Sequence, residues 1–232
     1  MAIFKNNPPI VTNGLVLYLD AANPLSYPGT GTTWSDLSGN NNSGSLVNGP
    51  TFSTDGGGSI VFDGINDYVQ PPAYNSTFNI RTGITLSIIL KRTSVFNQLS
   101  DTFFISRPPA WYFYDAYNSG FYRGEVFIDG VRQGGVQTQL PFDGRWYSII
   151  YTYDSNTRFS IIYKNGVAAS SIQLTGLSNY LIDSSTANFQ RICNNTLGRT
   201  FSLANLSIYN RALSQQEVLQ NYNALKSRFN LT

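Results

Sequence analysis

Apolar side chains occupy every second position in several stretches of the chain. Residues 15–20 place three leucines on one face, and residues 84–90 place four isoleucine or leucine side chains on one face. Residues 146–153 form a longer apolar run, whose many β-branched and aromatic side chains disfavour a helix. Residues 204–208 again put three apolar side chains on one face. Each of these stretches therefore predicts a β-strand.

Two dipeptides between apolar runs predict tight hairpins. Asn165-Gly166 separates the run that ends at Lys164 from the one that begins at Val167, and Asp129-Gly130 follows another short run. Type I′ turns need a positive φ at both central residues, which asparagine, aspartate and glycine tolerate best. The strands on either side of each dipeptide are therefore expected to pair antiparallel.

One segment near the C-terminus has the pattern of a helix. Ser214 and Glu217 have the spacing of a capping box, in which each side chain accepts a hydrogen bond from the other residue's backbone N–H. The apolar side chains of residues 218–225 then recur at helical spacing. Lys226 and Arg228 favour the negative end of the helix dipole. A helix over residues 214–228 is predicted, and its apolar stripe is expected to pack on the core.

Many short strands and one terminal helix predict an antiparallel sandwich of two sheets. A single helix cannot cover both faces of a parallel sheet, which argues against an α/β architecture. Residues 14–232 are expected to form one domain and residues 1–13 an N-terminal arm, because residues 6–9 are Asn-Asn-Pro-Pro. Two alternatives stay open for the arm: a frayed terminus, or a segment that lies along a neighbouring subunit.

Composition excludes several classes of function. Charged residues are 12% of the chain and the net charge is +2 without a basic run, so nucleic-acid binding is not expected. No window reaches the roughly 20 apolar residues of a membrane span, so membrane insertion is not expected. The lone Cys193 cannot form an intrachain disulfide and is expected to be a small buried side chain. Residues 1–5 lack the apolar stretch of a signal peptide, so synthesis in the cytoplasm without export is expected.

Six motifs occur in order along the chain: GLVLYLDAANP at 14–24, WSDLSGN at 34–40, NGPTF at 48–52, FDGINDYV at 62–69, YKNGV at 163–167 and IYNRALS at 208–214. This ordered series resembles the laminin-G-like, concanavalin A-like jelly-roll domains that are common in tailed-bacteriophage virion proteins. The resemblance implies an all-β, two-sheet antiparallel jelly-roll β-sandwich of the concanavalin A-like lectin/glucanase type, with a short C-terminal helix. It also implies a setting in large particle or surface proteins, where such domains bind sugars or decorate.

Catalysis is tested first by counting residues. The chain has no histidine, which excludes Ser-His-Asp and Cys-His arrangements and histidine-based zinc sites. Glucanases of the same fold cluster their carboxylates on one strand, whereas the only glutamates here are Glu125 and Glu217. Glu217 is assigned to the helix cap. Asp129 lies four residues after Glu125, about 13 Å along a regular strand, too far for a hydrolytic pair unless a bulge intervenes. The chain is therefore not expected to be an enzyme.

No cofactor is required by the sequence, although calcium is a candidate because family members often bind it through loop carboxylates. Calcium prefers several oxygen ligands supplied by a loop. The alternative is that these side chains form Asx-turns with their own backbone, and neither loop has the dense carboxylates of a strong calcium site. The candidate ligands are Asp36 with Ser38 and Asn40, and Asp63 with Asn66 and Asp67.

An aromatic-rich region is the candidate for glycan binding, because flat rings stack on sugars while aspartate and arginine bond to hydroxyls. The alternative is a strand pair with one face in the core and tyrosines at its rim. An exposed cluster would favour the glycan site. The candidate residues are Trp111, Tyr112, Tyr114, Asp115, Tyr122 and Arg123.

The resemblance, the low charge and the missing export signal predict a non-enzymatic virion structural protein. It would be a capsid decoration, head-fibre or tail-associated subunit of a bacteriophage, localised to the virion. Residues 1–13 would contact other capsid or tail proteins, and a homo-oligomer is expected. The alternative is a carbohydrate-binding adhesin that contacts host or environmental glycans.

Overall fold

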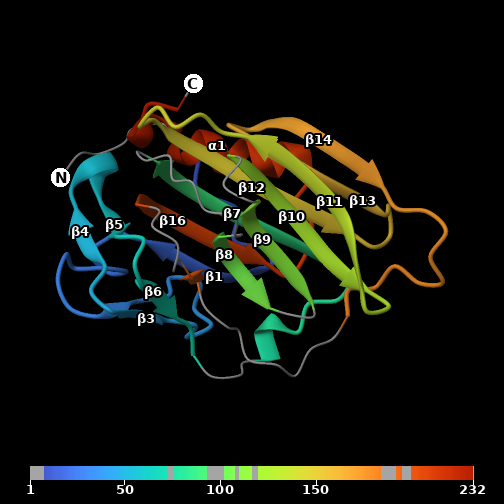
Figure 1. Cartoon of the computed structure of the whole chain (residues 1–232), viewed down its shortest axis with the longest axis horizontal. Coiled ribbons are helices and arrows are strands. Elements are labelled where there is room, and N and C mark those ends of the chain that lie inside the picture. The colour runs from blue at the N-terminus through green and yellow to red at the C-terminus, as the bar shows by residue number, and fades with distance from the viewer. Residues whose placement is uncertain are drawn as a thin grey trace.

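Two antiparallel sheets stacked face to face form the body of the protein (Figure 1). The computed structural model describes residues 8–72, 76–92, 102–107, 110–116, 120–183, 192–194 and 200–231. Within this part of the chain every strand pair is antiparallel. The predicted all-β sandwich is confirmed.

Sheet A has the order β14-β13-β12-β7-β16-β5-β4, and β1 also pairs with β16. Its strands are β1 (Leu15–Asp20), β4 (Thr51–Ser53), β5 (Ser59–Phe62), β7 (Gly83–Arg92), β12 (Trp146–Asp154), β13 (Phe159–Lys164), β14 (Val167–Gln173) and β16 (Phe201–Tyr209). Sheet B has the order β11-β10-β9-β8-β15-β6-β3-β2. Its strands are β2 (Thr33–Trp34), β3 (Gly44–Val47), β6 (Tyr68–Gln70), β8 (Thr102–Arg107), β9 (Trp111–Ala116), β10 (Phe121–Ile128), β11 (Val131–Gln139) and β15 (Ile192–Asn194).

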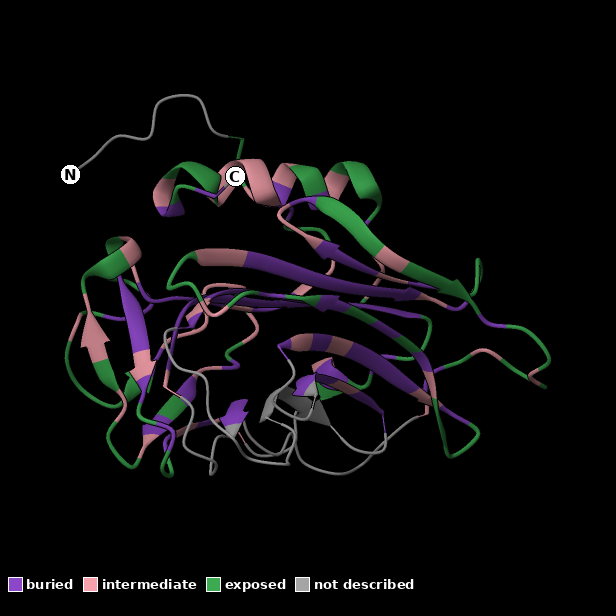
Figure 2. Ribbon diagram, turned by 45° about the horizontal axis from the view of Figure 1, so that its top comes forward, coloured by how far each residue is buried: buried purple, intermediate pink, exposed green. Residues whose placement is uncertain are grey.

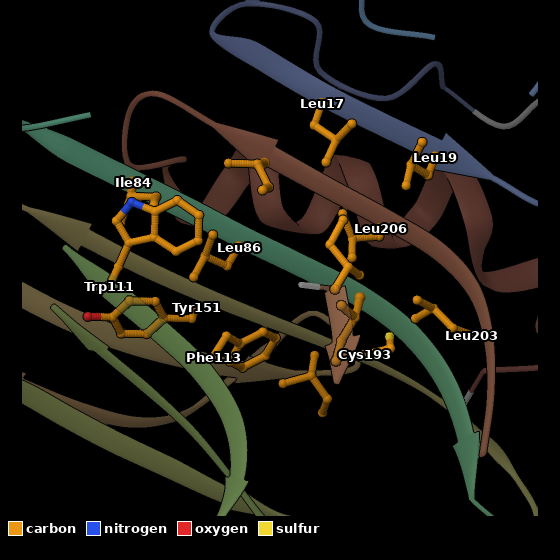
Figure 3. Packing of buried hydrophobic residues seen from close by; sticks show 14 of the residues in the cluster. Leu17, Leu19, Ile84, Leu86, Trp111, Phe113, Tyr151, Cys193, Leu203 and Leu206 are labelled. Atoms are coloured by element: carbon orange, nitrogen blue, oxygen red, sulfur yellow. The ribbon is translucent and has the colours of Figure 1, made fainter. Parts of the chain in front are cut away.

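The main core lies between the sheets, built from the alternating positions that the sequence pattern identified. Leu17 and Leu19 of β1, and Ile84 and Leu86 of β7, are fully buried there. Figure 3 shows these side chains with Trp111, Phe113 and Tyr151 in one packed layer, and Cys193 beside them. Cys193 is buried, which confirms the expectation, and burial raises the pKa of its thiol. Gly124 in β10 allows a close approach of the sheets, because a Cβ there would overlap the Tyr151 ring.

Both predicted hairpins are present. The β10–β11 turn holds Asp129 and Gly130 at φ 52° and 75°, and the β13–β14 turn holds Asn165 and Gly166 at φ 49° and 78°. These positive values are what the type I′ interpretation requires. The second turn also lies against the helix, since a Cβ on Gly166 would meet the ring of Tyr222.

The helix α1 (Gln215–Phe229) lies along the outer face of sheet A (Figure 2). It begins after Ser214, and the capping box with Glu217 is formed as predicted. Val218 of α1 packs against Ile150 and Tyr209, and Phe229 packs against Ile89 and Ala204. Two 3-10 turns, η1 (Asp55–Gly57) and η2 (Ser76–Phe78), complete the elements. No helix in the described part of the chain is long and apolar enough to cross a membrane.

A buried polar network ties the start of the chain to α1. The Val11 N–H donates to the Asn221 Oδ1 at 2.8 Å, and the Asn221 amide donates to the Tyr209 hydroxyl at 2.9 Å. That hydroxyl donates to the Val11 carbonyl at 3.0 Å, and Gln220 donates to the Pro9 carbonyl. Residues 9–13 are therefore held by their own chain. The predicted contact of residues 1–13 with a neighbouring subunit stays a prediction, and residues 1–7 lie outside the described residues.

Candidate functional site

The predicted glycan residues divide between the two faces of sheet B. Trp111 and Tyr122 are 0% exposed and point into the core between the sheets. Their assignment as glycan contacts is therefore wrong, because a strand sends alternate side chains to opposite faces and these two face inward. Asp115 is also buried, and its Oδ2 forms an ion pair of 2.8 Å with the Nη1 of buried Arg92. This ion pair holds the end of β7 in sheet A against β9 in sheet B.

The other three candidates belong to the outer face of sheet B. The strand register places Tyr112 opposite Glu125 and Tyr114 opposite Arg123. Tyr114 is nonetheless 2% exposed, whereas Tyr112 is half-buried. We call the group on this face the sheet B cluster; its members are Tyr112, Arg123, Glu125, Phe127 and Arg132.

The side chains of the sheet B cluster contact one another through a ring pair, a cation–π contact and two ion pairs. The Tyr112 ring packs edge-on against Phe127 with 5.3 Å between centroids, and the Arg132 guanidinium lies 4.9 Å from the Tyr112 centroid. Glu125, which is buried, accepts ion pairs from Arg123 at 3.0 Å and from Arg132 at 3.7 Å. A sugar that stacked on Tyr112 would have to displace Arg132, so the arrangement favours packing over recognition.

The two carboxylates weighed for hydrolysis belong to separate networks. A register shift of the β10–β11 pair at Glu125 supplies the bulge that shorter spacing would need. Asp129, however, lies in the turn after β10, where its carboxylate accepts hydrogen bonds from Ser178 and Asn179. Glu125 is neutralised by two arginines on the sheet face. The described residues therefore do not bring this pair together across a space in which a glycosidic bond could lie.

Asp36 is enclosed by hydrogen bonds from its own chain. Its Oδ1 accepts the N–H groups of Tyr18 and Ser38 at 2.9 Å each, and its Oδ2 accepts the Ser38 hydroxyl at 2.7 Å and the Asn42 N–H at 2.9 Å. This is the Asx-turn alternative that the sequence left open. The carboxylate organises the loop after β2 and has little capacity left for a cation.

Asp63 and Asp67 lie next to each other in the turn between β5 and β6. The Asp63 N–H donates to the Asp67 Oδ2 at 2.9 Å, and the Asp63 Oδ1 accepts the Ile65 N–H at 2.8 Å. Burial raises the pKa of Asp67, which works against the doubly ionised pair that calcium prefers. No group of three or more His, Cys, Asp or Glu side chains is gathered within the described ranges. Calcium at this turn stays a prediction.

A concave site lies elsewhere, where the start of β12 meets the β13–β14 turn and the end of α1. This hollow has a volume of about 610 Å³. We call it the β12 hollow. Its lining comes from three segments far apart in the sequence: Arg145, Trp146 and Tyr147; Lys164 and Asn165; and Phe229 and Asn230.

Trp146 and Tyr147 are half-buried at the border of the β12 hollow and are held from opposite sides of sheet A. Trp146 packs on Phe229 with 5.1 Å between ring centroids, and its side chain hydrogen-bonds to Asp55. The Tyr147 hydroxyl donates to the Asp143 Oδ2 at 2.9 Å. Burial and this bond raise the pKa of Tyr147 to about 12, so the phenol is a neutral donor at physiological pH.

Polar groups complete the β12 hollow. The Asn165 Oδ1 accepts the Ser148 N–H at 3.0 Å, which fixes the amide at the turn. The Lys164 ammonium lies 5.8 Å from the Tyr147 centroid and donates to the Gln139 carbonyl at 3.3 Å. Asn230 caps α1 in the left-handed conformation and faces the same space. Rings, amides and cations thus border one cavity, as in a site for a small polar ligand.

A sequence model described as the concanavalin A-like lectin/glucanases superfamily matches residues 62–219, which is more than half of the chain. The chain belongs to this superfamily. The predicted jelly-roll class is thereby confirmed. No curated protein sequence matches the chain.

Solved structures with the same superfamily fold are similar over most of this chain. The binding domain of Paraclostridial Mosquitocidal Protein 1 has 18% identity and a TM-score of 0.69, covering 92% of this chain and 52% of that one. The binding domain of botulinum neurotoxin DC, solved with rat synaptotagmin II, has 13% identity and a TM-score of 0.65, covering 93% and 52%. The same domain solved with SialylT has 15% identity and a TM-score of 0.62, covering 92% and 52%. This chain spans about half the length of these structures, and the likeness concerns the fold.

Sequence reasoning within the superfamily pattern missed the β12 hollow. Residues 146–153 are predicted to form a strand, and residues 148–153 of that strand are buried. Trp146 and Tyr147 at its start are only half-buried. Lys164 and Asn165 belonged to a hairpin signal, and Phe229 and Asn230 follow the predicted end of the helix. The one local hint was a Trp-Tyr pair directly after Asp143-Gly144-Arg145, a turn with two charges.

Proposed function

We propose that this chain is a non-catalytic carbohydrate-binding domain of a virus particle, and that the β12 hollow holds the glycan. The observation that carries the proposal is this cavity of about 610 Å³, with three aromatic side chains, two amides and two cations on its border. Its volume falls within the usual range of small-ligand sites, about 300–1,000 Å³.

The lining suits a sugar for chemical reasons. Half-buried Trp146 offers apolar surface to the C–H face of a pyranose, while Asn165, Asn230 and Lys164 offer polar groups to its hydroxyls. Trp146 is braced by Phe229 and Tyr147 by Asp143, so little side-chain freedom would be lost on binding.

Binding without cleavage is supported by how the carboxylates are used. Glu125 is paired with two arginines, Asp129 is bonded within its turn, and Glu217 closes the helix cap. The chain also has no histidine that could act as a general base. Similar folds that were solved as toxin binding domains, one of them with SialylT, accord with a binding role.

The setting we propose is a bacteriophage virion, as a capsid decoration, head-fibre or tail-associated subunit. Support comes from the ordered motif resemblance and from the 12% share of charged residues. The partners would be capsid or tail proteins and further copies of this chain. Mass spectrometry of purified particles tests this setting: the protein should be present in stoichiometric amounts, and its absence would contradict the proposal.

A glycan array tests carbohydrate binding. The folded wild-type chain should bind saturably to at least one saccharide, and Trp146→Ala should lose most of that binding. Tyr112→Ala is the matched control, because it removes an aromatic ring from the sheet B cluster. Circular dichroism would confirm that both variants are folded. Loss of binding in Tyr112→Ala alone would place the glycan on sheet B, and an array without any bound saccharide would refute the function.

A further inference from the structure

We infer that the saccharide held by the β12 hollow is acidic, carrying a carboxylate or a sulfate. This inference rests on the proposed function. Two of the seven residues that line the hollow, Arg145 and Lys164, are cations, and none is an aspartate or glutamate. The chain as a whole has a net charge of only +2, so the two cations in this lining are a local concentration of positive charge.

Lys164 supplies the first available charge. Within the described residues no carboxylate forms an ion pair with it, and its contacts are the Gln139 carbonyl and the Tyr147 ring. Both contacts leave the positive charge uncompensated, and both orient the ammonium at the border of the hollow. A protein cation without a carboxylate partner at the border of a cavity attracts an anionic ligand.

Arg145 supplies the second charge, which is only partly compensated. Its Nε lies 3.7 Å from the Asp143 Oδ2, and its side chain is 76% exposed. Partial burial opposes ionisation of Asp143, but hydrogen bonds from the Arg145 N–H and the Tyr147 hydroxyl outweigh it and lower its pKa. The ionised Asp143 is therefore shared between a phenol and a guanidinium. The ion pair with Asp143 uses the Nε of Arg145, and the Nη N–H groups of the guanidinium suit a carboxylate or sulfate.

Other cations near the hollow already form ion pairs with carboxylates, unlike Lys164 and to a greater extent than Arg145. Lys91 forms an ion pair with Asp55, and Arg228 forms one with Asp20 at 2.8 Å. Neither lines the hollow. The structure therefore combines two incompletely compensated cations with aromatic rings and amides, which is the chemistry that distinguishes an acidic sugar from its neutral parent.

The test compares each acidic saccharide with its neutral parent on one array. The pairs are sialyllactose with lactose, galactose sulfate with galactose, and trigalacturonate with its methyl ester. At low salt at least one acidic member should bind about tenfold more tightly than its parent, and the preference should shrink as added salt screens the charges. The first and third pairs report on carboxylate, and the second reports on sulfate.

Variants assign the preference to the β12 hollow. Lys164→Gln should reduce acidic binding about fivefold or more and reduce neutral binding much less, while Arg132→Gln, a cation of the sheet B cluster, should change neither. Equal binding of acidic and neutral members would overturn this inference and leave the proposed function in place. An acidic preference that survives Lys164→Gln and Arg145→Gln but is lost in Arg132→Gln would also overturn it. Failure of every saccharide to bind would refute the proposed function itself.

Discussion

The sheet B cluster and the β12 hollow are built from the same kinds of side chain, but those of the sheet B cluster pair with one another, whereas those of the β12 hollow border an open concave space. In the sheet B cluster, Arg132 lies against Tyr112 and Glu125 balances two arginines. In the β12 hollow, Lys164 has no carboxylate partner among the described residues, and a cavity of about 610 Å³ stays between the rings and the end of α1. An aromatic-rich segment can therefore bind a ligand only where the neighbouring polar side chains are not already paired with one another, so that they can pair with the ligand.

The largest expected effect concerns Trp111, the tryptophan among the glycan-binding residues that were predicted from the sequence. Trp111→Ala should lower the free energy of unfolding by about 3–5 kcal/mol, because it empties a fully buried position between the sheets. Urea unfolding followed by circular dichroism measures this loss. Tyr112→Ala on the other face should cost about 1 kcal/mol or less. Equal losses in the two variants would show that Trp111 is not a core residue.

A smaller effect is expected from the buried carboxylate of the sheet B cluster. Glu125→Gln should lower the free energy of unfolding by about 1 kcal/mol, because it removes the charge that pairs with Arg123 and Arg132, whose side chains are 38% and 48% exposed and can be solvated instead. Saccharide binding on the array should stay unchanged. If Glu125→Gln abolished binding without affecting stability, the cluster would be a recognition site and the comparison would be reversed.

The smallest effect extends the comparison to the N-terminal end of α1, where the Glu217 carboxylate is paired with Arg211. Hydrogen bonds from Arg211 lower the pKa of Glu217 to about 2, against about 4.5 in the unfolded chain. The folded form binds the proton more weakly, so this stability is present above pH 4.5 and is lost as the pH falls towards 2. Because the side chain is 29% exposed, the contribution should be below about 1 kcal/mol.

Unfolding free energies of the wild type and Glu217→Gln, measured between pH 2 and pH 6, check this contribution. The difference between them should be largest at pH 6 and vanish near pH 2. A difference that stayed constant over this range would mean that the capping box acts through shape alone.

The strands, hairpins and helix could be predicted because local chemistry determines them. Asn165-Gly166 specifies its turn through positive φ, and Ser214 with Glu217 specifies where α1 begins. The alternation of side chains along β9 does not say which face of the strand packs inward. Residues of both faces, Trp111 among them, were therefore predicted to bind a glycan. That choice depends on the opposite sheet, whose Tyr151 ring packs closely against Gly124 of sheet B.

The β12 hollow could not be predicted for a related reason. Trp146, Asn165 and Asn230 lie far apart in the sequence and meet only when α1 is placed along sheet A. The Asn221 network with Val11 and Tyr209 determines that placement, and no single segment contains it. A cavity defined by three segments becomes visible only after the fold is known.

The three tryptophans allow the most direct test of the central claim, that the β12 hollow and not the aromatic face of sheet B holds the glycan. Trp34 and Trp111 are fully buried, and only Trp146 borders the hollow. In NMR spectra of the ¹⁵N-labelled protein, titration with the saccharide that binds best on the array should shift the Trp146 indole signal and leave the other two in place. An unchanged Trp146 signal, with shifts confined to the backbone signals of Tyr112, Arg123 and Arg132, would contradict the account.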